Sequence, residues 1–152
     1  MKKKGFTLIE LLVVVAIMAM LAAMAVVALN TARARALDAR RVSDVKQIQT
    51  ALELYYLDQN TYPASVTGPL DGQCLDSGGW GLGCSGTTYM ASAPTNPRPV
   101  DDGKCSGAVA TNYYTYAYVS TNSYQLGYCI GSTTGNLHAG FHRATPAGIA
   151  DP

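Results

Sequence analysis

A single carboxylate, Glu10, stands inside an otherwise apolar stretch near the start of the sequence. Lys2, Lys3 and Lys4 precede it, and the next charged residue along the chain is Arg33. A lone carboxylate in hydrocarbon is energetically expensive, so acids at that depth usually have a defined partner. The alternative is that Glu10 lies at the depth of the lipid headgroups, where water solvates it. We favour a functional role for this side chain.

The cysteines are the second set of residues with a chemistry of their own. Four of them, Cys74, Cys84, Cys105 and Cys129, lie in the second half of the sequence. An even number in a Gly-rich, membrane-targeted chain favours disulfides over reduced core thiols. Of the three pairings that four cysteines allow, we favour Cys74–Cys84, which would close a Gly-rich loop, and Cys105–Cys129, which would tie a predicted hairpin. Each bond would contribute about 2–4 kcal/mol.

Three further clusters contain residue types that occur in binding sites, but none of them predicts a site. His138 and His142 have the spacing of metal ligands on a helix, yet Gly140 between them favours a loop with two solvated imidazoles. The segment 79–83 looks like a phosphate loop but lacks the flanking strand and helix, so we expect a flexible loop. The segment 101–103 offers two acids to Ca²⁺, although such pairs are commonly solvated turns. We expect no metal, no cofactor and no enzymatic activity.

The elements that position these residues follow from the distribution of helix breakers. Residues 6–62 contain no Gly and no Pro, whereas residues 63–152 contain all 7 prolines and all but one of the 15 glycines. Gly and Pro both disfavour the interior of a helix. The sequence therefore predicts one continuous helix from near Thr7 to near Leu57, with a stop at residues 58–63.

The first part of this helix is predicted to cross a membrane. The uncharged stretch Leu11–Leu29 would span about 28 Å, close to the hydrocarbon thickness of a bilayer. The three preceding lysines predict a cytoplasmic amino terminus and an exported remainder. A buried helix of a soluble domain is a weaker interpretation, because the stretch has no polar face.

The part of the helix beyond Asn30 is predicted to be amphipathic. Apolar residues recur along one face at Val45, Ile48, Leu52 and Tyr55. Arg40 and Asp44 are four residues apart, and we expect them to pair on the solvent side. The apolar face requires a cover.

Two alternating segments near the carboxyl end supply that cover. Residues 112–120 and 123–130 have the period of strands, and Thr121-Asn122 between them indicates an antiparallel hairpin. One strand places Tyr114, Tyr116 and Tyr118 on a single face, and the other places Tyr124, Leu126, Tyr128 and Ile130 together. Residues 64–111 are expected to be loops. The predicted fold class is α+β, a long amino-terminal helix packed on a small antiparallel sheet.

The stretch Lys-Gly followed by Phe6-Thr7-Leu8-Ile9-Glu10 and a long apolar helix resembles the amino terminus of a type IV prepilin or a type II secretion pseudopilin. The match covers residues 3–29, a weaker one continues through 39–63, and the remainder matches no motif. The resemblance implies that Gly5 ends a leader removed by a prepilin peptidase. Phe6 would become the N-methylated amino terminus, and Glu10 would serve assembly and methylation.

The resemblance also implies an organisation for the whole chain. Residues 1–5 would be the leader, 6–30 the transmembrane and filament-core helix, 31–62 its amphipathic continuation, and 63–152 a small disulfide-stapled domain. The precursor would span the cytoplasmic membrane once and then polymerise into an extracellular helical filament. An assembly ATPase and a membrane platform protein would drive that step.

The same resemblance suggests a partner for the buried acid. Cleavage would create an ammonium on Phe6, and Glu10 of a neighbouring protomer could pair with it, so our hypothesis is that Glu10 is tolerable only because another copy satisfies it. Many members of the family carry a Gly or Pro in the apolar helix. This chain has neither, and we expect its helix to stay continuous in a filament.

Several alternatives stay open at the level of sequence. The filament would be either a surface pilus for adhesion, motility or DNA uptake, or the pseudopilus of a secretion system. The chain could instead be an anchored binding module that does not polymerise. An ordinary secretory signal would be cut after Ala25 and leave Val26 first. A formal net charge of +1 does not indicate a nucleic-acid binder.

Overall fold

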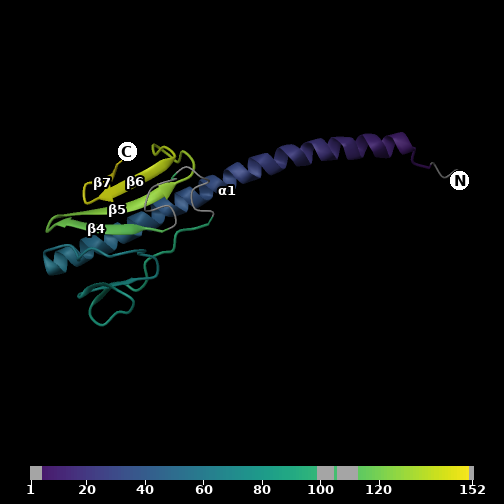
Figure 1. Cartoon of the computed structure of the whole chain (residues 1–152). Coiled ribbons are helices and arrows are strands. Elements are labelled where there is room, and N and C mark those ends of the chain that lie inside the picture. Colours follow the sequence, from purple (N-terminus) through teal and green to yellow (C-terminus); the bar gives the residue numbers. More distant parts are fainter. Residues whose placement is uncertain (1–4, 99–104, 106–112, 151–152) are drawn as a thin grey trace. The chain divides into compact units, whose positions relative to one another are not determined.

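A computed structural model of the chain describes residues 5–98, 105 and 113–150 (Figure 1). In this part of the chain a single helix, α1 (Leu8–Gln59), is followed by two small antiparallel sheets. The strands are β1 (Cys74–Asp76), β2 (Gly79–Gly81), β3 (Thr88–Met90), β4 (Thr115–Ser120), β5 (Ser123–Ile130), β6 (Gly140–Thr145) and β7 (Gly148–Ala150). The predicted α+β class is confirmed. The chain divides into two compact units, Met1–Ala34 and Arg35–Pro152.

Helix α1 begins and ends where local chemistry supplies caps. Thr7 stands at its start, and Asn60 follows its last residue with a φ of 54°. Asn tolerates this left-handed conformation better than most residues, which makes it suitable just after a helix. The amide of Asn60 donates to the carbonyl of Tyr56 at 2.8 Å. The helix ends two residues beyond the predicted Leu57 and has no break at residues 22–27.

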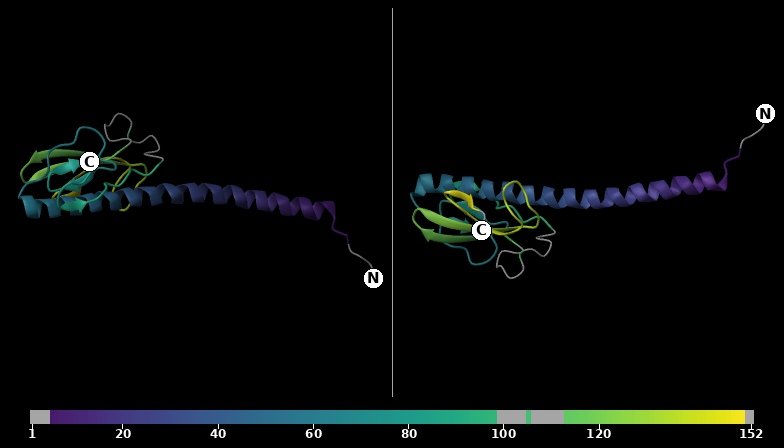
Figure 2. Two further views of the ribbon diagram at one scale, coloured as in Figure 1. Left: turned by 90° about the horizontal axis from the view of Figure 1, so that it is seen from below. Right: turned by 90° about the horizontal axis from the view of Figure 1, so that it is seen from above.

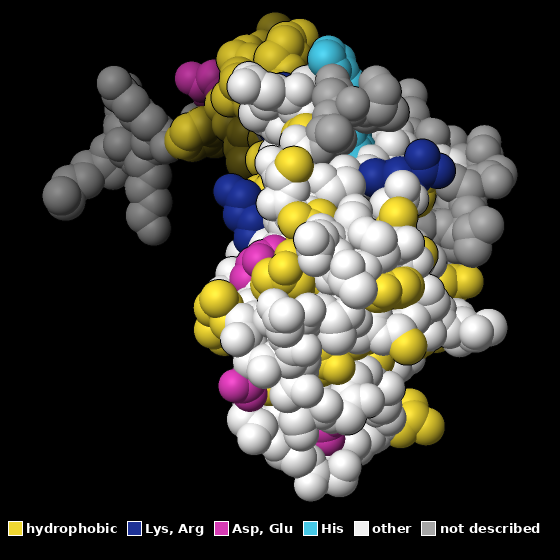
Figure 3. Space-filling model, turned by 90° about the vertical axis from the view of Figure 1, so that its left-hand side faces the viewer, with side chains coloured by type: hydrophobic (Ala, Val, Ile, Leu, Met, Phe, Trp, Pro, Cys, Tyr) yellow, Lys and Arg dark blue, Asp and Glu magenta, His cyan; other side chains and the backbone are white. Residues whose placement is uncertain are grey.

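The first unit presents an apolar surface to its surroundings. The large apolar side chains between Leu8 and Leu29 are exposed on every side of the helix. By length and composition α1 contains a stretch able to cross a membrane. In the second unit, by contrast, the face in Figure 3 shows apolar side chains scattered among polar ones. The amino-terminal helix therefore needs a cover that its own unit does not supply.

The larger sheet lies along the carboxyl-terminal part of α1 (Figures 1 and 2). Its order is β4-β5-β6-β7, and all of its pairs are antiparallel. Strands β4 and β5 pair through Tyr116↔Leu126 and Tyr118↔Tyr124, and they are joined by Thr121 and Asn122. The predicted hairpin is confirmed.

The core of the second unit joins the apolar face of α1 to this sheet. Its fully buried members include Val45, Ile48, Leu52, Tyr114, Tyr124, Leu126, Tyr128 and Ile130. The predicted packing of the helix on the hairpin is therefore confirmed. Tyr118 differs from the prediction, since 37% of its side chain is exposed. The pairing of β4 with β5 shifts register between Tyr118 and Ser120, which breaks the alternation at this end of the strand.

The prediction that residues 64–111 form only loops is wrong. A second sheet of order β2-β1-β3 lies in this segment. Asp76 organises its turns, because its carboxylate accepts the amides of Gly78 at 2.8 Å, Ser85 at 2.6 Å and Gly86 at 3.1 Å. Gly79–Gly81 form strand β2. The prediction of a flexible loop at 79–83 is therefore wrong for these three residues. Trp80 pairs with Leu75 across the sheet instead.

The structure joins Cys74 to Cys84 and Cys105 to Cys129, which is the pairing that the sequence analysis favours. The first disulfide links the start of β1 to Cys84 and so encloses β2, and the second links Cys105 to β5. Both bonds cross-link segments that have few large aliphatic residues, where disulfides replace missing core.

The two histidines have different environments. His138 is exposed, whereas His142 is fully buried in β6, stacks on Tyr128 at 5.5 Å, and has Nε2 2.7 Å from the carbonyl oxygen of His138. The prediction of two solvated imidazoles is wrong for His142, because the strand β6 turns this residue into the core. Within the described residues no group of three or more possible metal ligands is found. The candidate calcium loop at 101–103 lies outside the described residues.

Candidate assembly site at the amino terminus

The segment that precedes α1 lies outside regular secondary structure and is accessible. Gly5 and Phe6 are both exposed, and the Phe6 side chain has 85% of its surface accessible. No regular element includes them, since α1 begins at Leu8. The backbone between Gly5 and Phe6 is therefore open to an enzyme that binds an extended chain.

Glu10 lies in the first turn of α1 and forms a capping box with Thr7. One carboxylate oxygen, Oε2, accepts the Thr7 amide at 2.8 Å and the Thr7 hydroxyl at 2.6 Å. In return, the Glu10 amide donates to Thr7 Oγ1 at 3.4 Å. This reciprocal arrangement satisfies amide donors that a helix start leaves open, and it places a negative charge at the favourable end of the helix dipole.

The capping box corrects one part of the sequence hypothesis. We expected Glu10 to be tolerable only because another copy of the chain satisfies it. The structure shows that Thr7 of the same chain already provides two donors. Both of them contact Oε2, and in the described part of the chain no donor contacts Oε1. The second oxygen is thus available to an external donor.

The carboxylate stands beside an apolar hollow on one side of the helix. Phe6, Ile9, Glu10, Val13 and Val14 line it. Ile9, Glu10, Val13 and Val14 follow the i, i+1, i+4, i+5 spacing of one helix face, and Phe6 precedes them just before α1 begins. The arrangement combines an anionic oxygen with an apolar surface, which suits a partner that carries a cation next to apolar side chains.

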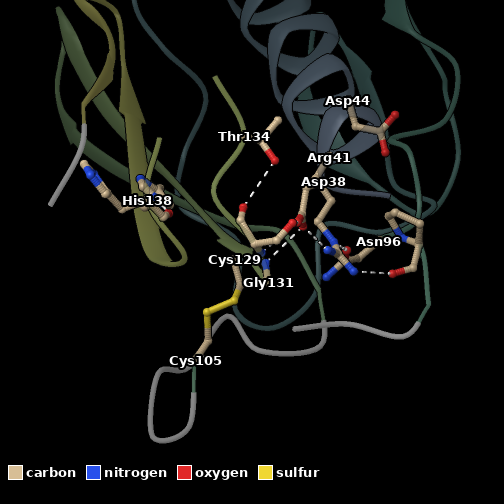
Figure 4. Close-up of polar contacts among 12 residues, drawn as sticks. Asp38, Arg41, Asp44, Asn96, Cys105, Cys129, Gly131, Thr134 and His138 are labelled. Carbon is tan, nitrogen blue, oxygen red and sulfur yellow. Dashed lines mark hydrogen bonds and ion pairs between the residues drawn. A yellow bond between two sulfur atoms is a disulfide. The ribbon is translucent and has the colours of Figure 1, made fainter. Parts of the chain in front are cut away.

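A second set of charged residues was missed by the sequence reasoning. Asp38, Arg41 and Asp44 of α1 are buried, with 1%, 2% and 5% of their surface accessible, although only Asp44 was assigned a side in the sequence analysis, the solvent side. They come together with the second half of the chain (Figure 4). The expected Arg40–Asp44 pair on the solvent side is wrong, because Asp44 turns inward and accepts the hydroxyl of Tyr114 at 2.9 Å.

A spacing signal for this cluster was present in the sequence. Asp38 and Arg41 precede the apolar stripe and continue its spacing of alternately three and four residues, so they fall on the buried face. Charged residues are seldom fully buried unless they are paired, so this spacing was not interpreted as evidence of burial.

Comparison with known proteins gives matches concentrated in the amino-terminal part. Residues 1–26 match the family described as the prokaryotic N-terminal methylation motif. The type II secretion system core protein G of Pectobacterium carotovorum subsp. carotovorum is 37% identical over 67 residues, which are 44% of this chain and 43% of that protein. The protein of that name from Vibrio cholerae is 31% identical over 98 residues, 64% of this chain and 55% of its own length.

The chain thus spans about half the length of the curated relatives it matches. No solved structure gives a significant match. The similarity includes the residues that form the amino-terminal site, namely Gly5, Phe6, Thr7 and Glu10.

Proposed function

We propose, from the premise that this chain belongs to the type IV pilin and pseudopilin superfamily, that it is a structural subunit of a type IV pilus-like filament. The observation that carries the proposal is the methylation motif of residues 1–26. It is joined to an apolar helix that is exposed on every side and whose first turn holds Glu10. Such a helix requires lipid or other protein around it.

Processing is the first step of the proposed function. A prepilin peptidase removes residues 1–5 after Gly5, and the new amino terminus at Phe6 is then N-methylated. The exposure of Gly5 and Phe6 and their position outside α1 support this step. The new terminus carries an ammonium group four residues before Glu10.

Assembly is the second step. The Phe6 ammonium of one protomer pairs with Glu10 Oε1 of a neighbour, while Thr7 continues to hold Oε2. The apolar hollow beside Glu10 receives apolar side chains of the neighbouring helix. Because the helix moves from lipid to protein neighbours, the gain comes from packing and from this ion pair, and not from transfer out of water. Residues 6–30 form the filament core, 31–62 continue the helix, and the domain at 63–152 forms the surface.

The proposal includes a route and a set of partners. The precursor spans the cytoplasmic membrane once, and the assembled filament lies outside the cell. Extraction of a membrane helix requires external work, which an assembly ATPase and a platform protein supply. The chain polymerises with further copies of itself, and we propose no cofactor and no enzymatic role.

A second candidate is a pseudopilin of a type II secretion system. The type II secretion system core proteins G that are 31% and 37% identical to this chain favour it. Both candidates use the same helix and the same amino-terminal site. They differ in their product, since a pilus subunit predominates in filaments sheared from the surface, whereas a pseudopilin supports the release of secreted proteins.

The test compares Glu10→Gln with Glu10→Asp in the full chain expressed in its own host. We expect Glu10→Gln to reduce filament yield by at least about tenfold, because a neutral side chain cannot pair with the ammonium. Glu10→Asp retains the charge and should keep part of the yield. Sheared fractions and electron microscopy measure assembly, and membrane fractions measure the level of the subunit.

Two results would contradict the proposal. If Glu10→Gln left filaments at normal yield and length, the ion pair would have no role. If no filament contained the wild-type chain, an anchored binding module would be the better interpretation. Mass spectrometry of the mature amino terminus adds an independent check, since a methylated Phe6 is expected and a start at Val26 would indicate an ordinary secretory signal.

A further inference from the structure

The buried part of α1 begins with a pair of charges and not with an apolar residue. Asp38 and Arg41 have 1% and 2% of their surface accessible, and no earlier residue of α1 within the described part of the chain is buried. The next buried residues along the helix are Asp44 and Val45, where the apolar core starts. The first buried turn of α1 is therefore held by charged groups, whereas the later turns are held by apolar packing.

Asp38 binds the chain that follows β5. Its carboxylate accepts the amide of Gly131 at 3.0 Å, the amide of Ser132 at 2.8 Å and the hydroxyl of Ser132 at 2.5 Å (Figure 4). It also forms a salt bridge with Arg41 one turn further along α1. The carboxylate thus has a donor for each of its oxygens without any contribution from solvent.

Arg41 binds the chain that follows β3. Its Nε donates to Asn96 Oδ1 at 3.0 Å, and its Nη2 donates to the carbonyl oxygen of Pro97 at 3.0 Å. The remaining nitrogen, Nη1, binds Asp38. The planar guanidinium is suited to such a set of fixed acceptors. Together the two charges connect α1 with two segments that are distant in sequence.

We propose that Asp38, Arg41, Asn96, Gly131 and Ser132 form a polar clamp that opens as one unit. When the clamp is closed, α1 packs from Asp38 onward. When it is open, packing starts at Asp44, and the free part of the helix is longer by about 9 Å. The clamp opens as a unit because each charge compensates the other, and a buried charge that loses its partner is strongly unfavourable.

The apolar core is a separate set of residues from the clamp. Val45, Ile48 and Leu52 belong to the buried apolar cluster, and none of the clamp residues is a member of it. Local opening of a segment with few apolar contacts requires less free energy than global unfolding. The clamp therefore sets how much of α1 the domain holds, and this role is independent of whether the chain polymerises.

The test compares Arg41→Gln with Arg40→Gln, its exposed neighbour, in the full chain in detergent micelles. Hydrogen–deuterium exchange with mass spectrometry reads two segments separately, the one that contains Gly131 and Ser132, whose amides donate to Asp38, and residues 48–55. In Arg41→Gln we expect exchange at Gly131 and Ser132 to accelerate by about 100-fold, because Asp38 loses its partner, while 48–55 changes by less than about threefold. Arg40→Gln should match the wild type in both segments.

A double-mutant cycle tests the claim that the clamp opens as a unit. Asp38→Asn and Arg41→Gln should each accelerate exchange at Gly131 and Ser132, and the double variant should accelerate it no more than either single variant, because it leaves neither charge unpaired. Multiplying effects in the double variant would overturn the proposal. So would equal acceleration in both segments, an unchanged rate at Gly131 and Ser132, or loss of the fold in Arg41→Gln, since each would show that the pair does not act as a local unit.

Discussion

Thr7 gives Glu10 a partner inside its own chain, and this changes how the acid is understood. The motif around Gly5, Phe6 and Glu10 can be recognised from the sequence, because residue types and offsets define it. The hydrogen bonds between Thr7 and Glu10 follow the capping-box spacing of three residues. They were overlooked because the sequence analysis considered the acid by its depth in the membrane and not by its spacing from Thr7.

Replacing Thr7 by Val should loosen the start of α1. The variant removes the hydroxyl that donates to Glu10 at 2.6 Å and accepts from its amide, and loss of such a cap costs about 1 kcal/mol. We expect amide exchange over residues 8–11 to accelerate by about fivefold in micelles. Thr31→Val is the matched control, since this hydroxyl only donates to the Val27 carbonyl within the helix. Equal effects in both variants would refute the capping role.

Asp44 should be a source of pH-dependent instability. Burial raises the pKa of Asp44, while the hydrogen bond from Tyr114 and the charge of Arg40 act in the opposite direction. A carboxyl whose pKa is raised on folding contributes stability that is complete below its unfolded pKa and lost as the pH rises through the folded value. Charged Asp44 therefore weakens the fold at neutral pH.

Asp44→Asn keeps an acceptor for Tyr114 and removes the ionisation. We expect its Tm to equal that of the wild type below about pH 4 and to be higher by a few degrees at pH 7. Thermal unfolding followed by circular dichroism at both pH values measures the difference. A lower Tm at pH 7 would show that the charged hydrogen bond outweighs the burial penalty.

At the scale of elements, predictability depends on length and period. Helix α1 follows from the absence of Gly and Pro over residues 6–62, and the β4–β5 hairpin follows from alternation over several residues on each strand. Strands β1 to β3 have three residues each, too few for a period. They are held by Asp76 and by the Cys74–Cys84 disulfide, which connect residues that a local pattern does not relate.

Gly127 illustrates a constraint that only the assembled sheet reveals. A Cβ at this position would meet Thr115 Oγ1 and would lie 2.9 Å from Cζ of Phe141. Both neighbours belong to flanking strands, so both side chains would have to shift to admit a methyl group. The sequence places this glycine inside a predicted strand, where an isolated glycine indicates a close approach, but it does not identify the neighbours.

Gly127→Ala should therefore destabilise the second unit by about 1–3 kcal/mol, the usual range for overpacking in a core. Gly83→Ala is the control, because a Cβ there meets nothing within 4 Å. Chemical denaturation of both variants provides the measurement. If the two midpoints agreed, the sheet would be able to adjust to the methyl group, and the close packing at Phe141 would have no energetic consequence.

For the whole molecule, the main expectation concerns α1 in an assembled filament. The helix is unbroken over residues 22–27 and contains no Gly or Pro between Phe6 and Tyr62. Melting a segment without these residues exposes backbone groups to an apolar environment, where they have no partners. A cryo-EM map of the filament should show continuous helical density through Ala22–Val27. A gap there would show that neighbouring subunits can unwind even a sequence with high helix propensity.

The two disulfides impose an order in time on the life of the proposed subunit. Disulfides are rare in a reducing cytosol, where thiol reductants keep cysteines in the thiol form. The same applies to Cys74–Cys84 and Cys105–Cys129. On the proposed route the nascent domain therefore crosses the membrane before its cross-links form, and it matures on the far side. Oxidation then acts as a checkpoint, because a domain that has not been cross-linked would enter the filament without the bonds that replace its missing core.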